Sequence, residues 1–229
     1  MCVQFLGCTR LEAPFPLEEN APQIQSTIFS QEIRRQYKPM IETKIVTPNL
    51  LDALNRLFCT NKYSEKCWCM WHIIAVKAFH AGGSEQNRAQ LTALAQTETT
   101  PIGLLAYQNG EPVGWCAVGP RERYARAIKT PSYRQKDEDP YTNVWLVPCF
   151  FTRTEARGIG VSKRLLGAAV QLASDHQAEA IDGFPFTNDK RRSSSQIHVG
   201  FESTFSACGF KPLRRPSDSR VVMRRILAA

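Results

Sequence analysis

The sequence contains no apolar run close to the roughly 20 residues that a membrane-spanning helix requires. Its longest apolar stretch, residues 144–151, is interrupted by Pro148 and is better explained as a buried strand. Residues 1–20 carry scattered apolar side chains without the continuous apolar segment of a secretory signal. We therefore expect a cytoplasmic protein that does not enter a membrane.

Signatures of metal and nucleotide sites are missing as well. Cys67 and Cys69 form the only closely spaced pair among eight cysteines, and no second pair follows at zinc-ribbon distance. Neither the three-glycine dinucleotide fingerprint nor a P-loop with Gly-Lys-Ser/Thr is present. We therefore expect no metal.

The composition is typical of one folded domain with an added arm. Apolar residues make up 43% and charged residues 22% of the chain, which excludes disorder of the whole chain. Residues 1–37 include three prolines and no sustained periodicity. We expect an irregular N-terminal extension there, followed by one folded domain over residues 38–229.

The net charge of +8 and the sequence pI of about 9.2 favour a polyanionic partner. Charge alone does not distinguish a nucleic acid, a membrane surface and a phosphate-rich cofactor. Basic runs at residues 190–192, 214–215 and 224–225 leave nucleic-acid binding open as an alternative. These runs are short and no DNA- or RNA-binding signature accompanies them, so we do not expect nucleic acid to be the main partner.

Hydrophobic periodicity predicts alternating strands and helices. Asn109-Gly110 between residues 102–107 and 112–118 indicates a β-hairpin. Strand patterns occur at residues 41–46, 144–151, 178–184 and 220–226, and helical spacing occurs at residues 50–57, 87–95, 161–173 and 200–208. The order predicts an α/β (α+β) domain with a mixed twisted sheet of about six to seven strands and helices on both faces. Residues 67–79 fit either a strand or a buried helix, and residues 120–141 fit a long loop or a flexible flap.

Residues 151–162 carry the clearest chemical signal. A buried strand ends, Gly158 and Gly160 form a turn, and an amphipathic helix begins. Successive backbone N–H groups and the helix N-terminus at such a junction bind phosphate. Arg157, Lys163 and Arg164 add positive charge. The alternative is a strand–turn–helix junction in which the two glycines are incidental.

The segment Arg157-Gly158-Ile159-Gly160-Val161 resembles motif A of the GNAT N-acetyltransferases. Gly158 and Gly160 match the last positions of that motif, whereas Glu155 departs from its first position. The hairpin sequence of residues 110–115 and the late Gly209-Phe210 also resemble the family. Cys67–Trp71, Cys149–Phe151 and Asp182–Pro185 further resemble an uncharacterised bacterial subgroup of it.

The resemblance implies that acetyl-coenzyme A is a co-substrate, held between two splayed strands. Main-chain groups of Phe150, Phe151 and Thr152 would face the acetyl and pantetheine parts. The pyrophosphate would be wrapped by Arg157, Gly158, Ile159, Gly160, Val161 and Ser162. A primary amine of a small molecule or peptide would then attack the thioester directly.

Catalysis by direct attack needs a base for the ammonium and an acid for the departing thiolate. Asp182, within an otherwise apolar strand, is our first choice for the base. The family often uses a tyrosine as the acid where this chain has Phe205, so we expect that His198, Ser203 or water replaces it or that the thiolate leaves unprotonated. Glu138 and Asp139 are equally able to attract a cationic substrate.

Two features have competing interpretations. Cys149 is either an acyl-carrying nucleophile or, more simply, a buried core thiol. Trp68, Met70, Trp71 and His72 either line a substrate pocket or pack in the core, with His72 bonded to a backbone group. Acyl-coenzyme A binding without transfer is a further alternative, and a homodimer is left open.

Overall fold

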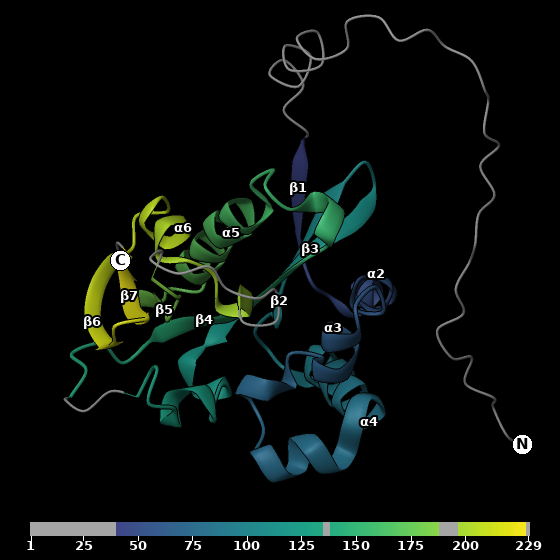
Figure 1. Ribbon diagram of the computed structural model, residues 1–229, viewed down its shortest axis with the longest axis horizontal. Helices are drawn as coiled ribbons and strands as arrows, with labels where there is room; N and C mark the ends of the chain where they lie inside the picture. Colours follow the sequence, from purple (N-terminus) through teal and green to yellow (C-terminus); the bar gives the residue numbers. More distant parts are fainter. Residues whose placement is uncertain (1–39, 135–137, 188–196, 228–229) are drawn as a thin grey trace, which may run out of the picture. The chain divides into compact units, whose positions relative to one another are not determined.

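A seven-stranded mixed sheet runs through the described residues of the computed structural model, which are 40–134, 138–187 and 197–227 (Figure 1). The strands are β1 (Ile41–Ile45), β2 (Gly103–Gln108), β3 (Glu111–Pro120), β4 (Val144–Thr152), β5 (Ala180–Gly183), β6 (Lys211–Ser217) and β7 (Arg220–Ile226). Their order is β1-β2-β3-β4-β5-β7-β6, and β4–β5 is the parallel pair within this sheet. The predicted fold class and strand number are confirmed. The predicted extension at residues 1–37 lies outside the described residues.

The central hairpin forms because its turn residues accept left-handed backbone angles. Asn109 has φ 52° and Gly110 has φ 81°, as a two-residue type I′ turn requires. The turn joins β2 to β3 in antiparallel register from Gln108↔Glu111 onward.

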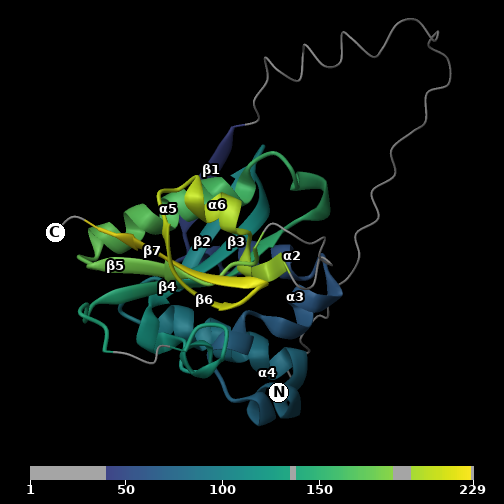
Figure 2. The same cartoon turned by 60° about the vertical axis from the view of Figure 1, so that its left-hand side comes forward.

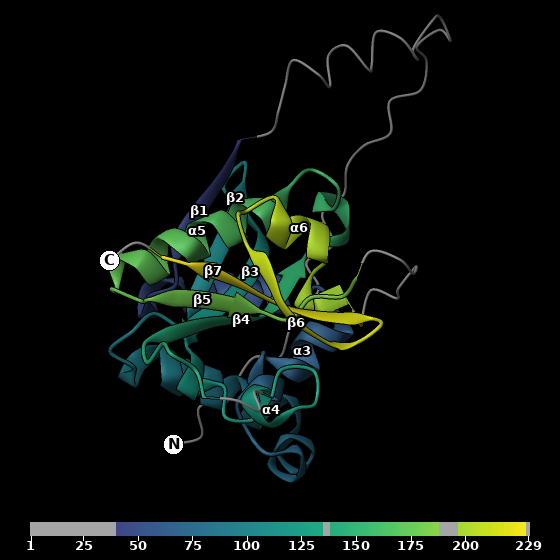
Figure 3. The same ribbon diagram turned by 90° about the vertical axis from the view of Figure 1, so that its left-hand side faces the viewer.

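Helices cover both faces of the sheet, and alternating strand residues enter two separate cores. On one face, α5 (Val161–Asp175) packs with α6 (Glu202–Ser206), and its buried stripe includes Leu165 and Ala169. On the other face lie α2 (Leu51–Phe58), α3 (Lys62–Cys67) and α4 (Val76–Thr97). Figures 2 and 3 show α5 and α4 on opposite sides of the sheet. Cys116 enters the first core and its neighbour Trp115 the second, as the two-residue period of a strand dictates.

The segment of residues 67–79 is a series of short helical pieces rather than one strand. Trp68 and Cys69 have φ 46° and 53°, which ends α3 and turns the chain into the 3-10 helix η2 (Met70–His72). The helix α4 then begins, and Gly83 at φ 62° kinks it. The left-handed angles of Trp68 and Cys69 cannot be recognised from an apolar pattern, because both are residue types that rarely adopt them.

The described residues between β3 and β4, 121–134 and 138–143, form a long loop that is anchored to the domain. Its described part includes the 3-10 helices η3 (Arg121–Arg123) and η4 (Ala127–Lys129). Its own residues Tyr124 and Tyr133 are almost completely buried and join a third small core. The loop is therefore a fixed part of the wall around β5, at least over the residues described.

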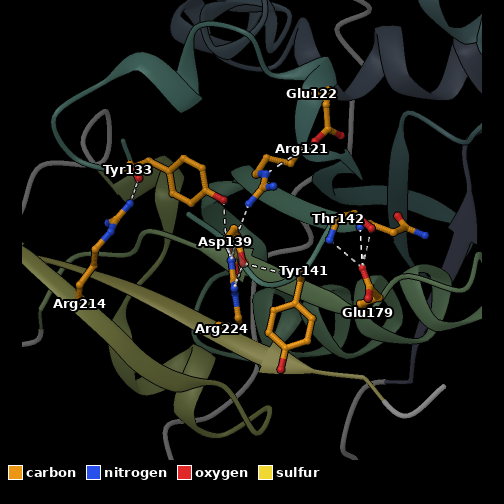
Figure 4. Close-up of polar contacts among 11 residues, drawn as sticks. Arg121, Glu122, Tyr133, Asp139, Tyr141, Thr142, Glu179, Arg214 and Arg224 are labelled. Atoms are coloured by element: carbon orange, nitrogen blue, oxygen red, sulfur yellow. Dashed lines mark hydrogen bonds and ion pairs between the residues drawn. The ribbon is translucent and has the colours of Figure 1, made fainter. Parts of the chain in front are cut away.

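A buried ionic network ties that loop to β5 and β7 (Figure 4). The Arg224 guanidinium donates to Asp182 at 2.6 and 2.8 Å and to Asp139 at 2.7 and 2.8 Å. Tyr133 donates its hydroxyl to Asp182 at 2.6 Å, and Arg121 pairs with Asp139. Hydrogen bonds from Arg224, helped by Arg121, hold the pKa of Asp139 well below its usual range. The network replaces the hydration that these charged groups lose on burial.

We predict that Arg224→Ala destabilises the domain by about 3–5 kcal/mol, because it leaves the fully buried Asp182 carboxylate without its ionic partner. Urea denaturation of the two proteins measures the difference. Arg215→Ala is the control: Arg215 also pairs with a carboxylate, on Glu202, but its side chain is 53% exposed, so a change of about 0–1 kcal/mol is expected. Equal effects of the two substitutions would contradict the network's structural role.

Candidate active site

The site begins where β4 loses its parallel partner. The β4–β5 register runs from Val144↔Ala180 to Val147↔Gly183 and ends there. The next residue of β4, Pro148, has no N–H to donate to a continuing ladder. Residues 149–152 still pair with β3, so alternate residues direct backbone groups away from β3 on the side that β5 has left.

A cavity of about 900 Å³ opens at this separation. Its lining includes the end of β4 from Cys149 to Thr152, the loop and first turn of α5, the α3–η2 region, and the segment before α6. Figure 1 shows β4 between α5 and the α3–α4 side. Of the predicted coenzyme-binding residues, Phe150, Phe151, Thr152, Arg157, Gly158, Gly160, Val161 and Ser162 line this cavity. Ile159 does not: it packs against the core beside α5.

The glycine loop before α5 presents backbone donors to the cavity. Gly158 has φ +79° and Gly160 has φ +92°, and no atom lies within 4 Å of where a Cβ on either would stand. The first intrahelical bond runs from Arg164 N–H to the carbonyl of Gly160. The N–H groups of residues 161–163 therefore have no intrahelical acceptor, and no side chain caps the helix. This open helix start has the geometry of an anion site.

Two neighbouring histidines line the same cavity. The ring centroids of His72 and His198 lie 5.5 Å apart. His72 is 5% exposed, and its Nε2 is buried without a hydrogen-bond partner. Burial, followed by the neighbouring His198, holds the pKa of His72 well below 6.5. The hydroxyl of Thr152, also buried, has no partner either.

Asp182 lies outside the cavity lining. It is fully buried, and its two oxygens accept from Arg224 and Tyr133. The structure therefore does not bring the two predicted catalytic residues, Asp182 and His198, into one pocket. Glu138 and Asp139 do not line the cavity either.

Phe205 occupies a core position rather than the cavity. Its ring packs on Phe150 and Phe210 at 6.1 and 5.0 Å between centroids, and a Cβ on Gly183 would clash with it. The glycine of β5 thus makes room for this ring. The adjacent Thr204 does line the cavity.

Three cysteine thiols line the cavity. Cys69 Sγ lies 3.4 Å from Cys149 Sγ and accepts from Trp115 Nε1 at 3.0 Å. The hydrogen bond with Cys69 and burial raise the pKa of Cys149 well above that of a free thiol. Burial raises the pKa of Cys67 to about 12. A nucleophilic cysteine needs a lowered pKa, so this environment favours core thiols over an acyl-cysteine.

Among the described residues, no group of three His, Cys, Asp or Glu side chains is arranged to hold a metal ion. Within the same residues, no helix is both long and apolar enough to cross a membrane. Of the basic runs, Arg224 is buried in its ion pairs and Arg215 pairs with Glu202, while residues 190–192 lie outside the described part of the chain.

Comparison with known proteins identifies one family model. The model of the acetyltransferase (GNAT) family matches residues 68–193, which is more than half of the chain. None of the curated proteins compared matches the sequence.

Solved structures with a similar arrangement include the PaiA N-acetyltransferase of Thermoplasma acidophilum in complex with coenzyme A. It is 13% identical, with 82% of this chain and 99% of that chain covered and a TM-score of 0.46. The acetyltransferase of Thermus thermophilus is 14% identical, with 82% and 97% covered and a TM-score of 0.47. The aminoglycoside N-acetyltransferase AAC(6')-Iy in complex with CoA is 14% identical, with 77% and 91% covered and a TM-score of 0.48.

The buried His72 makes stability depend on pH with a definite sign. Its folded-state pKa lies below the unfolded value of 6.5, so the unfolded chain binds this proton first as the pH falls. We predict that the free energy of unfolding falls below pH 6.5 by at most about 1.4 kcal/mol per pH unit from this residue. His72→Gln removes this contribution, and urea denaturation between pH 5 and 8 measures it. The exposed His80→Gln serves as the control, and an unchanged slope in His72→Gln would contradict the assignment.

Proposed function

The chain belongs to the GNAT acetyltransferase family, and from this premise we propose that it transfers an acetyl group from acetyl-coenzyme A to a primary amine. The observation that carries the proposal is the opening of three features into one cavity. These are the unpaired end of β4, the glycine loop before α5, and the unpartnered imidazole of His72. Together they supply an anion site, backbone donors and a proton acceptor.

The residues present fit the coenzyme. The space beside Gly158 and Gly160 admits close approach of a pyrophosphate to the backbone, and the first-turn N–H groups of α5 would hold it. Arg157 and Lys163 add positive charge at the same end of the cavity. Backbone groups of residues 150–152 and the hydroxyl of Thr152 would orient the pantetheine and the thioester. Ile159 would contribute through the loop's position rather than through its side chain.

His72 is the base that we propose for the amine. Its lowered pKa keeps the imidazole neutral at neutral pH, so a nitrogen can accept a proton. Its Nε2 is buried without a hydrogen-bond partner, and an amine that displaces the atoms covering it would provide the missing hydrogen bond. His198, which lines the same cavity, is the proton donor that we propose for the departing thiolate. The neutral amine attacks the thioester carbonyl directly, His72 takes the proton that the nitrogen then loses, the acyl–sulfur bond breaks, and the thiolate receives its proton from His198.

Asp182 has a different role in this proposal. Its oxygens are already held by Arg224 and Tyr133, so it fixes β5 beside the cavity as a positioning residue. Phe205, likewise, supports β4 and β5 from the core. Proton transfer is therefore assigned to the two histidines.

We predict that acetyl-coenzyme A raises the melting temperature of the parent protein and that Gly158→Asp and Gly160→Asp abolish this rise. Ligand at a hundred times its Kd adds about 2.7 kcal/mol to the free energy of unfolding. A carboxylate on either glycine would oppose the pyrophosphate and strain a positive φ. Gly167→Asp is a control, because Gly167 is exposed on α5, the helix that follows the glycine loop, and does not line the cavity. An equal rise in all four proteins would sink the assigned coenzyme site.

We predict that His72→Gln lowers kcat/KM for the amine by about 10²–10⁴-fold, the usual contribution of a general base. The shift in melting temperature with acetyl-coenzyme A should stay at the parent value, since the glycine loop is untouched. Release of the coenzyme thiol reports turnover, and His80→Gln should react at the parent rate. Parent activity in His72→Gln would assign the base elsewhere.

Binding of acyl-coenzyme A without transfer is the second candidate function. One observation favours it: the aromatic residue of α6 is a phenylalanine buried in the core, which has no proton to donate. A thermal shift with acetyl-coenzyme A, combined with no thiol release for any amine, would select this alternative.

A further inference from the structure

Five aromatic residues, here called the aromatic wall, line the cavity from segments other than β4 and the glycine loop. They are Phe58 at the end of α2, Tyr63 in α3, Trp71 in η2, Phe79 in α4 and Phe201 before α6. Trp71 and Phe79 stack edge to face at 5.1 Å between ring centroids. Rings from five segments of the lining give the cavity an apolar surface that an apolar body covers well, with Phe58, at 1% exposure, contributing least.

The described lining of the cavity contains no aspartate or glutamate. Its charged side chains are Lys66, Arg157 and Lys163, all of them cationic. The nearby carboxylates of Asp139 and Asp182 are already engaged by Arg224. An ammonium group entering the cavity therefore meets no counter-charge from the described lining.

Further positive charge lies against a residue of the aromatic wall, Trp71. The guanidinium of Arg126 stacks on the Trp71 ring at 3.3 Å and donates to the Trp71 carbonyl at 2.8 Å. Arg126 and Arg220 both contribute to the lowered pKa of His72, so their field reaches the proposed base. The same field favours the neutral form of a bound amine, which is its nucleophilic form.

From these observations we infer that the acceptor is a compact monoamine with an aromatic or other apolar body. This inference rests on the proposed acetyl transfer at the same site. A diamine, a polyamine or a lysine side chain beside further cations is disfavoured, because each additional ammonium loses its hydration without gaining an ion pair. The volume of about 900 Å³, shared with the end of the coenzyme, accommodates an acceptor of this size.

The sharpest test compares a monoamine and a diamine with the same four-carbon chain, together with a monoamine that carries a phenyl group. With the full chain and acetyl-coenzyme A, thiol release is measured for butylamine, 1,4-diaminobutane and 2-phenylethylamine. We expect kcat/KM to be at least tenfold higher for butylamine than for the diamine, and highest for 2-phenylethylamine. A diamine that matches or exceeds butylamine, or a phenyl group that brings no gain, would overturn the inference.

A charge placed in the wall should reverse the preference. Phe79→Asp supplies the missing carboxylate, so the ratio of butylamine to diamine should fall by about tenfold or more. Phe79→Asn is the control, because asparagine has nearly the same shape as aspartate but no charge. It should keep the parent ratio. If Phe79→Asp does not fold, Tyr63→Asp replaces it, because Tyr63 is 55% exposed and still lines the cavity. An unchanged ratio in the folded aspartate variant would contradict the electrostatic argument.

The melting temperature separates failure of the inference from failure of the proposed function. If acetyl-coenzyme A stabilises the protein but none of these monoamines is acetylated, the acceptor inference is wrong and the coenzyme site stands. If acetyl-coenzyme A does not stabilise the protein, the proposed function fails first and the inference falls with it.

Discussion

The separation of β4 from β5 is the constraint on which the site depends. Up to Val147↔Gly183 the two strands share a ladder, and after it Pro148 offers no donor. The register of β4 with β3 also shifts at this level, between Ala117 and Gly119. The bulge and the proline together let β4 continue on one partner alone. The uncovered edge then lies next to the start of α5, so backbone donors from a strand and a helix converge on one space.

This separation removes hydrogen bonds from β5, which is already a short strand of four residues. The ionic network compensates on the far side of β5. Arg224 from β7 is hydrogen-bonded both to Asp182 in β5 and to Asp139 in the loop before β4. Buried ion pairs seldom add much net stability, but they penalise any arrangement that separates the partners. We interpret the network as fixing the position of β5, and thereby the width of the opening, rather than as a large source of stability.

Much of the fold follows from local sequence patterns, whereas the site depends on contacts that such patterns do not encode. The hairpin at Asn109, the apolar strand β4 and the stripe of α5 are local signals, and the structure has all three. The edge strand β6 is not predicted from the sequence, because Pro212 and its exposed charged residues lack a strand pattern and are typical of protected edges.

The same distinction explains the site residues. Asp182 stands out in an apolar stretch, but its partner Arg224 lies 42 residues further along the chain, and only the fold brings them together. His72 stands in an aromatic segment that is equally suited to a core. Its unpartnered nitrogen becomes visible only when the left-handed turn at Trp68 and Cys69 has placed it against His198.

Positive charge is found at both ends of the cavity, and it has a different consequence at each end. The net charge of +8 is compatible with several polyanions, but the cations at the glycine loop are joined to a helix start, which suits a pyrophosphate. Toward the aromatic wall, burial and then His198, Arg126 and Arg220 favour the neutral form of His72. The proposed base is thus kept unprotonated by burial and by cations other than those at the glycine loop, and the positive field of Arg126 and Arg220 opposes a charged acceptor. The base can be neutral here without a carboxylate beside it, and the absence of acidic side chains from the described lining is consistent with that requirement.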